Sequence, residues 1–175
     1  MTHVNIRVLL SKKLSHQLPS KEKMEVIVRF LTSHNMCVLA TCENNVPRAT
    51  PIEYYSEGTT IYLMTDEGTK LNNIRTNPVV SIGINDPLTD WLSIRGIQIT
   101  GTARLIKDDN PDYWEAMKIY RWDNLGKDIG WTRPPHGYTI ARIDSDRVEY
   151  LDLSMKLRGY SEKQIWERHT PEVNQ

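Results

Sequence analysis

Two threonines and one lysine crowd a single turn of the chain: Thr65, Thr69 and Lys70. An apolar run at residues 61–64 precedes the turn, and a short helix is predicted for residues 69–76. A helix N-terminus offers unpaired backbone N–H groups and the positive end of a dipole, so it suits a phosphate group. Lys70 adds a positive charge, and the threonines add hydroxyl donors. The turn is therefore a candidate phosphate site. The alternative is that Thr65 caps a surface helix and Lys70 is solvated.

Length and charge limit the classes of protein to consider. The chain has 175 residues, which is the size of one domain and enough for a sizeable core. Its 22 Lys and Arg residues balance 22 Asp and Glu residues, whereas a nucleic-acid binder would carry a basic excess. The apolar run at residues 8–10 is too short for a signal-peptide core or a membrane span. We therefore expect a cytoplasmic protein without nucleic-acid or membrane partners.

Cysteines and histidines show no pattern of metal ligands. Cys37 and Cys42 are five residues apart on one expected strand, so their side chains point to opposite faces and a disulfide between them is not expected. The five histidines have no ligand spacing either, and no metal site is predicted. No acid–base pair stands out in the sequence, so no catalytic residue is named.

The remaining pattern predicts a mainly β protein with few helices. A helix is expected to begin at Ser20 and another after Asn110 and Pro111. Strands are expected at residues 36–42, 46–55, 59–65, 78–84 and 91–107, followed by a loop at residues 126–135 and a hairpin of residues 138–143 and 147–153. Neither face of residues 91–107 is cleanly apolar, and Gly96 and Gly101 should bend that strand. Antiparallel strands in this number indicate a barrel or a sandwich.

Five segments, in this order and spacing, resemble the FMN-binding split-barrel family named for pyridoxamine 5'-phosphate oxidase. They are the hairpin of residues 36–42 and 46–51, residues 61–65, residues 68–70, residues 71–80 and residues 99–105. The resemblance covers residues 20–153. It implies an antiparallel six-stranded split β-barrel of Greek-key type with short flanking helices. Residues 1–19 would form an N-terminal arm, and residues 154–175 a tail with one helical turn near Ile165.

The resemblance also implies a homodimer with two FMN molecules at its interface. The strand that carries Arg48, Ala49 and Thr50 would run beside the isoalloxazine ring, and Thr65, Thr69 and Lys70 would hold the phosphate. Vitamin-B6 oxidases place a glutamine of the partner subunit at the position of Gly96; Gln98 lies two residues further on the same face and is taken as its substitute. The expected cofactor-binding residues are thus Arg48, Ala49, Thr50, Thr65, Thr69, Lys70 and Gln98.

Two departures argue against the specific vitamin-B6 activity. The turn at residues 68–70 has one basic residue where those oxidases usually have two, and no segment of the tail matches their substrate-binding arginine. The resemblance thus implies an FMN-dependent oxidoreductase whose substrate and electron donor are open. Three alternatives remain. They are a deazaflavin binder, a heme binder with His136 as the axial-ligand candidate, and a non-enzymatic flavin-binding or stress-response module. Trp91, Trp122 and Trp131 either line a flavin or pack in the core.

Overall fold

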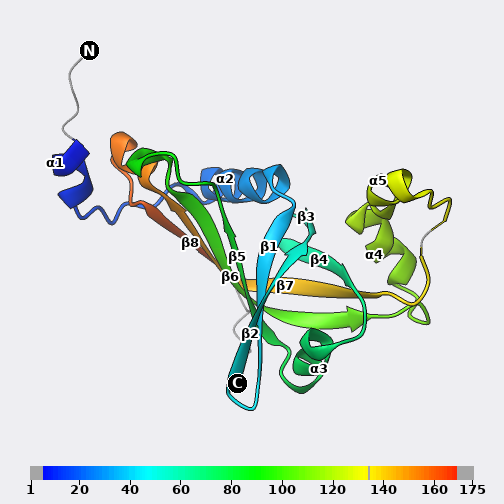
Figure 1. Ribbon diagram of the computed structural model, residues 1–175. Helices are drawn as coiled ribbons and strands as arrows, with labels where there is room; N and C mark the ends of the chain where they lie inside the picture. The colour runs from blue at the N-terminus through cyan, green and yellow to red at the C-terminus, as the bar shows by residue number, and fades with distance from the viewer. Residues whose placement is uncertain (1–5, 134, 169–175) are drawn as a thin grey trace, which may run out of the picture.

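The computed structural model describes residues 6–133 and 135–168, which form one antiparallel sheet with short helices around it (Figure 1). The expectation of a mainly β split barrel is confirmed, with eight strands in place of six. The strand order is β2-β1-β5-β6-β7-β4-β3, and β8 also pairs with β7. The elements are α1 (Ile6–Ser11), α2 (Ser20–Ser33), β1 (Met36–Glu43), β2 (Val46–Glu53), β3 (Tyr55–Glu57), β4 (Thr60–Thr65), α3 (Thr69–Thr76), β5 (Val79–Asn85), η1 (Trp91–Ser93), β6 (Arg95–Ile106), α4 (Tyr113–Tyr120), α5 (Trp122–Gly126), η2 (Lys127–Ile129), β7 (Thr139–Asp152), η3 (Leu153–Arg158) and β8 (Lys163–Glu167).

The long strands β6 and β7 form the centre of the sheet, with β5, β1 and β2 on the side of β6 and β4, β3 and β8 on the side of β7. β7 pairs with β6 along its length, whereas its other edge pairs with β4 at residues 139–143 and with β8 at residues 147–151. The register of β6 shifts between Thr100 and Gly101, as expected for a bulged barrel strand. A Cβ atom at Gly101 would lie 2.7 Å from the backbone oxygen of Asp144, so the close approach of β7 requires glycine here.

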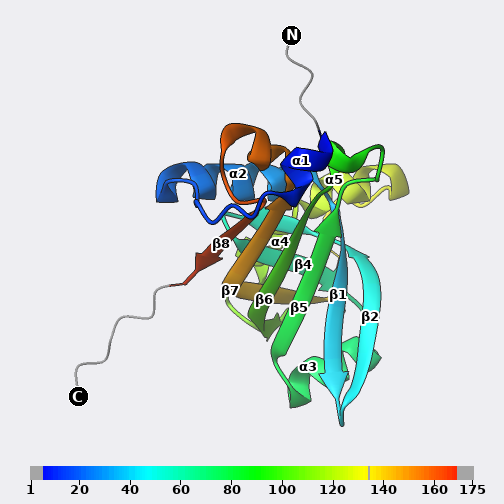
Figure 2. The same ribbon diagram turned by 90° about the vertical axis from the view of Figure 1, so that its left-hand side faces the viewer.

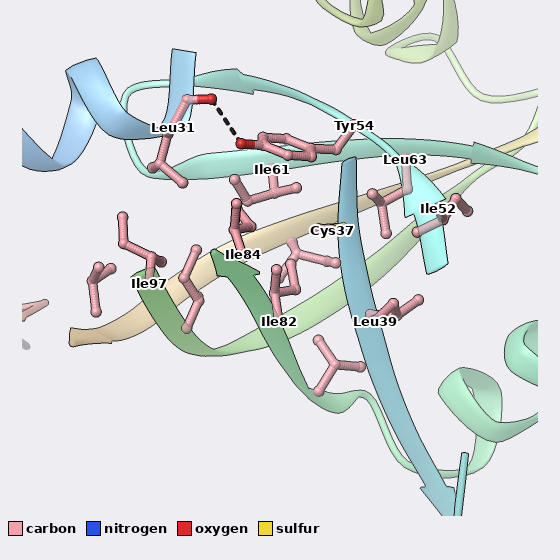
Figure 3. Packing of buried hydrophobic residues seen from close by; sticks show 14 of the residues in the cluster. Leu31, Cys37, Leu39, Ile52, Tyr54, Ile61, Leu63, Ile82, Ile84 and Ile97 are labelled. Carbon is pink, nitrogen blue, oxygen red and sulfur yellow. Dashed lines mark hydrogen bonds between the residues drawn. The ribbon is translucent and has the colours of Figure 1, made fainter. Parts of the chain in front are cut away.

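The concave face of the sheet holds the main core. In β6, Ile97, Ile99 and Ala103 are buried, while Gln98 and Thr100 are exposed. One face of β6 is therefore apolar, and the expectation that neither face would be cleanly apolar was wrong. The expected strand began at Trp91, but residues 91–93 form a 3₁₀ turn and β6 begins only at Arg95. Figure 3 shows the core side chains of β1, β4, β5 and β6 meeting beneath α2.

The expected closing hairpin at residues 138–153 was wrong, because residues 139–152 form the single strand β7. Asp144, Ser145 and Asp146 have the composition of a turn. However, Ser145 is fully buried and its hydroxyl donates to the backbone oxygen of Thr59, while Asp144 accepts from Arg142 at 3.0 Å. These contacts keep the segment extended.

The two ends of the described chain are tied together and to the sheet. Ile165, where a helical turn was expected, lies in strand β8. The ammonium of Lys156, with only 4% of its side chain exposed, donates to the backbone oxygens of Lys12 (2.6 Å) and Leu10 (3.3 Å). The backbone N–H of Leu18 donates to the side-chain oxygen of Gln164 in β8 at 2.7 Å. Residues 10–18 are thereby held against η3 and β8.

Within the described residues, no helix is long and apolar enough to cross a membrane.

Tyr54 links α2 to the sheet and gives a test of this packing. It is fully buried between β2 and β3, and its hydroxyl donates to the backbone oxygen of Leu31 at 2.7 Å (Figure 3). Leu31 lies in the last turn of α2, where carbonyl groups lack helical partners. Tyr54→Phe should therefore lower the free energy of unfolding by about 1–3 kcal/mol, measured by urea denaturation. The control is Tyr138→Phe, which removes a hydroxyl with no hydrogen bond inside the described part of the chain. Equal stability of the two variants would contradict the prediction.

Candidate functional site

The N-terminus of α3 has the geometry expected of a phosphate-binding turn. The first helical hydrogen bond runs from the N–H of Asn72 to the oxygen of Gly68 at 3.1 Å, so the three preceding N–H groups have no intrahelical acceptor. Gly68 is the N-cap residue, and no side chain caps the helix. Thr65 is buried at the end of β4, and its hydroxyl donates to the backbone oxygen of Asp66 at 3.2 Å. The alternative interpretation of Thr65 as a helix cap is therefore wrong.

Among the described residues, the charges around this turn leave the ammonium of Lys70 without an ion-pair partner. Lys70 is half-buried and forms no ion pair within the described part of the chain. The turn has two carboxylates, and neither binds Lys70: Asp66 is exposed to solvent, and Glu67 is bound by Arg75 at 2.7 Å and by Lys107 at 3.3 Å. The hydrogen bond from Arg75 is the main cause that lowers the pKa of Glu67. Glu67 is thus neutralised by other residues, and within the described ranges Lys70 has no carboxylate partner.

Helix α3 is fixed against the end of β1 by side-chain hydrogen bonds. The buried amide of Asn73 lies 3.0 Å from the hydroxyl of Thr41. When its oxygen accepts from Thr41, its nitrogen also donates to the backbone oxygen of Thr69 at 3.0 Å. The hydroxyl of Thr76 donates to Glu43 at 3.0 Å. The sequence analysis did not find Asn73 or Thr41, because the two residues are 32 positions apart and nothing local connects them.

Strand β2 places Arg48, Ala49 and Thr50 beside the same end of β1. Arg48 pairs with Thr41, and Thr50 pairs with Leu39, so these two side chains share the face on which Thr41 and Leu39 are buried. Arg48 is exposed and has no ion pair in the described part of the chain, and Thr50 is half-buried. Thr41 therefore joins the two segments, because it is the strand partner of Arg48 and the hydrogen-bond partner of Asn73.

The free edge of β2 has a restricted set of hydrogen-bond donors. β2 is the first strand of the sheet order, and in the part of the chain that the structure describes it pairs only with β1. Pro47 and Pro51 have no N–H, so they fit at positions where the backbone nitrogen faces the open edge and not β1. Ala49 lies between them in the same alternation, and its N–H therefore points outward. Among these three residues, only Ala49 offers a backbone donor at the open edge.

Gln98 lies apart from the other predicted site residues of the same chain. It is exposed on β6, opposite Gly83 of β5 and Glu149 of β7. This is the outer face of the sheet, whereas the side chains of Arg48 and Thr50 project from the inner face. Within one chain the structure therefore brings Arg48, Thr50 and the turn at residues 65–70 to one corner and leaves Gln98 elsewhere. The binding role of all seven residues stays a prediction.

The other residues with possible chemistry do not gather at this corner. Burial raises the pKa of the Cys37 thiol to about 12, and both cysteines are free. His136 is exposed, with Nδ1 3.8 Å from Asp108 and its ring edge-on to Trp114. Trp91 is exposed in η1, whereas Trp122 and Trp131 pack against the smaller core cluster beneath α4. Among the described residues, no group of three His, Cys, Asp or Glu side chains is placed to hold a metal ion.

Sheet, bulge and flanking helices together define a split β-barrel. The family model described as pyridoxamine 5'-phosphate oxidase matches residues 24–152. The chain belongs to this family.

Solved structures with the same fold have different ligands or roles in their names. General Stress Protein 26 from Bacillus anthracis is 22% identical, with a TM-score of 0.58 over 85% of this chain and 98% of its own. An FAD-binding protein from Mesorhizobium loti is 21% identical, with a TM-score of 0.58 over 75% of this chain and 92% of its own. A heme binding protein from Mycobacterium smegmatis is 19% identical, with a TM-score of 0.61 over 86% of this chain and 59% of its own. At these identities the likeness is one of fold.

Proposed function

We propose that the protein binds FMN between β2 and the N-terminus of α3 and acts as an FMN-dependent oxidoreductase. The observation that carries the proposal is the turn at residues 65–70. It combines helical N–H groups that have no intrahelical acceptor with the ammonium of Lys70, which forms no ion pair among the residues described, while the carboxylate of Glu67 is already neutralised. Such a turn suits a ligand that accepts several hydrogen bonds and carries negative charge. A phosphate monoester does both, because it has several acceptor oxygens and nearly two negative charges.

Strand β2 supports the assignment of the ring end of the cofactor. An isoalloxazine ring has acceptors along one edge. The outward N–H of Ala49 and the guanidinium of Arg48, which has no ion pair among the described residues, are donors on β2, the strand paired with β1, against which α3 is fixed. In this proposal the flavin supplies the electron transfer. The residues of the chain anchor the phosphate, orient the ring and place positive charge at its polar edge. No side chain is assigned a nucleophilic role.

We also propose that the functional unit is a homodimer formed through the outer face of the sheet. Figure 2 shows the strands β2, β1, β5, β6 and β7 side by side with no helix lying across them. Three apolar residues expose 41–54% of their surface on this face, namely Met36, Val38 and Val79. Gly83 and Gly96 have no side chain that would project from it. Exposed apolar side chains on a sheet face without a covering helix are typical of a subunit contact. In such a dimer, Gln98 of each subunit would lie in the contact.

The absorption spectrum of the purified protein tests the cofactor directly. We expect flavin bands, and titration of the apoprotein with FMN should saturate at one FMN per chain. A Soret band would indicate a heme binder, like the heme binding protein from Mycobacterium smegmatis. The absorption bands of a deazaflavin would indicate a deazaflavin binder. Any spectrum without flavin, together with no response to added FMN, would contradict the proposal. Turnover of NAD(P)H by the FMN-loaded protein would separate an oxidoreductase from a non-enzymatic flavin-binding or stress-response module.

A further inference from the structure

A pocket away from the phosphate turn lies between α2, the start of β6, the end of β7 and η3. It has a volume of about 470 Å³. Three arginines from three different elements line it, namely Arg29 of α2, Arg95 of β6 and Arg158 of η3. Three guanidinium groups thus line one pocket, and two of them are held in ion pairs with carboxylates outside its lining, Arg95 with Asp86 and Arg158 with Glu22.

Among the described residues, Asp152 is the one carboxylate that lines this pocket, and its oxygens already accept hydrogen bonds. It accepts from the backbone N–H of Ser154 at 2.9 Å, from the Ser154 hydroxyl at 2.6 Å and from the Tyr150 hydroxyl at 3.0 Å. These bonds cap η3. Asp152 therefore serves the backbone of the turn, and no arginine of the pocket is bonded to it within the residues that the structure describes.

The three guanidinium groups retain unused donors. Arg95 is bound to Asp86 through Nε and one terminal nitrogen, each at 2.6 Å, and Arg158 is bound to Glu22 through one terminal nitrogen. Arg29 is exposed and its side chain makes no ion pair inside the described ranges. Each guanidinium has five N–H donors, so all three keep donors for a ligand. The exposed fractions of the Arg95 and Arg158 side chains are 48% and 50%, so a ligand can reach both.

We infer that this pocket, lined by Arg29, Arg95 and Arg158, is a binding site for a small organic phosphate. Guanidinium groups that approach from three elements suit a tetrahedral anion, whereas a single planar carboxylate is matched by one arginine. The rest of the lining includes Val26, Phe30 and Met155, which form an apolar wall for the organic part of the ligand. The pocket shares no lining residue with the turn at residues 65–70, so this site is independent of the proposed flavin site.

Isothermal titration calorimetry of the purified protein with phenyl phosphate tests this inference. We expect one ligand per chain at this pocket and weaker binding of inorganic phosphate, which lacks the apolar part. Arg29→Gln should weaken the binding of phenyl phosphate by about tenfold. The matched control is Lys21→Gln, which removes one charge from an exposed position on the same helix and should leave binding unchanged. Arg29 lies on the helix surface and holds no ion pair in the described part of the chain, so Arg29→Gln is expected to fold.

Two further titrations distinguish this pocket from the turn at residues 65–70 and from a carboxylate site. Lys70→Ala should leave the binding of phenyl phosphate at this pocket unchanged; loss of binding in Lys70→Ala but not in Arg29→Gln would assign the phosphate to α3 and overturn the inference. Citrate tests whether the pocket prefers a carboxylate ligand. Tighter binding of citrate than of phenyl phosphate would overturn the phosphate assignment. Absence of binding in the wild-type protein would also overturn the inference, whether or not the protein binds FMN.

Discussion

Lys70→Ala is expected to weaken the binding of FMN by about tenfold or more without unfolding the protein. A charged hydrogen bond to a phosphate contributes about 1.5–3 kcal/mol, and a loss of 1.4 kcal/mol corresponds to a tenfold change in the dissociation constant. Lys70 is half-buried, and in the described part of the chain no carboxylate pairs with it. Its removal therefore leaves no partner charge unpaired in the apoprotein. Fluorescence titration of the apoprotein with FMN measures the effect.

The control for this experiment is Lys21→Ala, which removes the same charge from the exposed first turn of α2. It should bind FMN as the wild-type protein does, and its binding curve corrects for any effect of total charge. A comparison of riboflavin with FMN adds a second control, because riboflavin lacks the phosphate. Lys70→Ala should change the affinity for riboflavin little. An unchanged dissociation constant for FMN in Lys70→Ala would remove this residue from the site.

The features that the sequence predicted correctly depend on neighbouring residues. The bounds of α3, Thr69–Thr76, and the start of β1 at Met36 agree with expectation, since helix and strand patterns are local. Cys37 and Cys42 are both free thiols, as expected, because their spacing on one strand points their side chains to opposite faces. The candidate phosphate turn could be named for the same reason, because its parts lie within six residues of each other. Its binding role stays a prediction.

The features that the sequence analysis missed depend on contacts between distant segments. Ser145 has the composition of a turn residue, but its bond to Thr59, 86 positions away, keeps β7 continuous. β8 pairs with residues 147–151 and is anchored to Leu18 through Gln164. The bond between Asn73 and Thr41 that fixes α3 is of the same kind. Such pairs leave no periodic signal in one sequence, whereas hydrophobic alternation does.

Gly83→Arg is expected to convert a dimer of this chain into a monomer and to abolish tight binding of FMN. Gly83 lies in the middle of β5 on the outer face, between Val38 of β1 and Gln98 of β6. A Cβ atom at this position would meet nothing within 4 Å, so the isolated chain has room for a larger side chain. Obligate interfaces commonly bury more than about 2,000 Å², and a charged side chain at the centre of such a contact is strongly unfavourable.

Light scattering should report about twice the chain mass of 20.3 kDa for the wild-type protein and a single chain for Gly83→Arg. Thr32→Arg is the matched control, because it adds the same side chain at an exposed position of α2, away from this face. Both variants should keep the circular-dichroism spectrum of the wild-type protein. FMN affinity should fall with the loss of the dimer, since Gln98 faces away from Arg48 and Thr50 of its own chain. A monomeric wild-type protein saturated with FMN would show that one chain completes the site and would reject the dimer proposal. A dimeric Gly83→Arg with normal affinity would move the interface to another face.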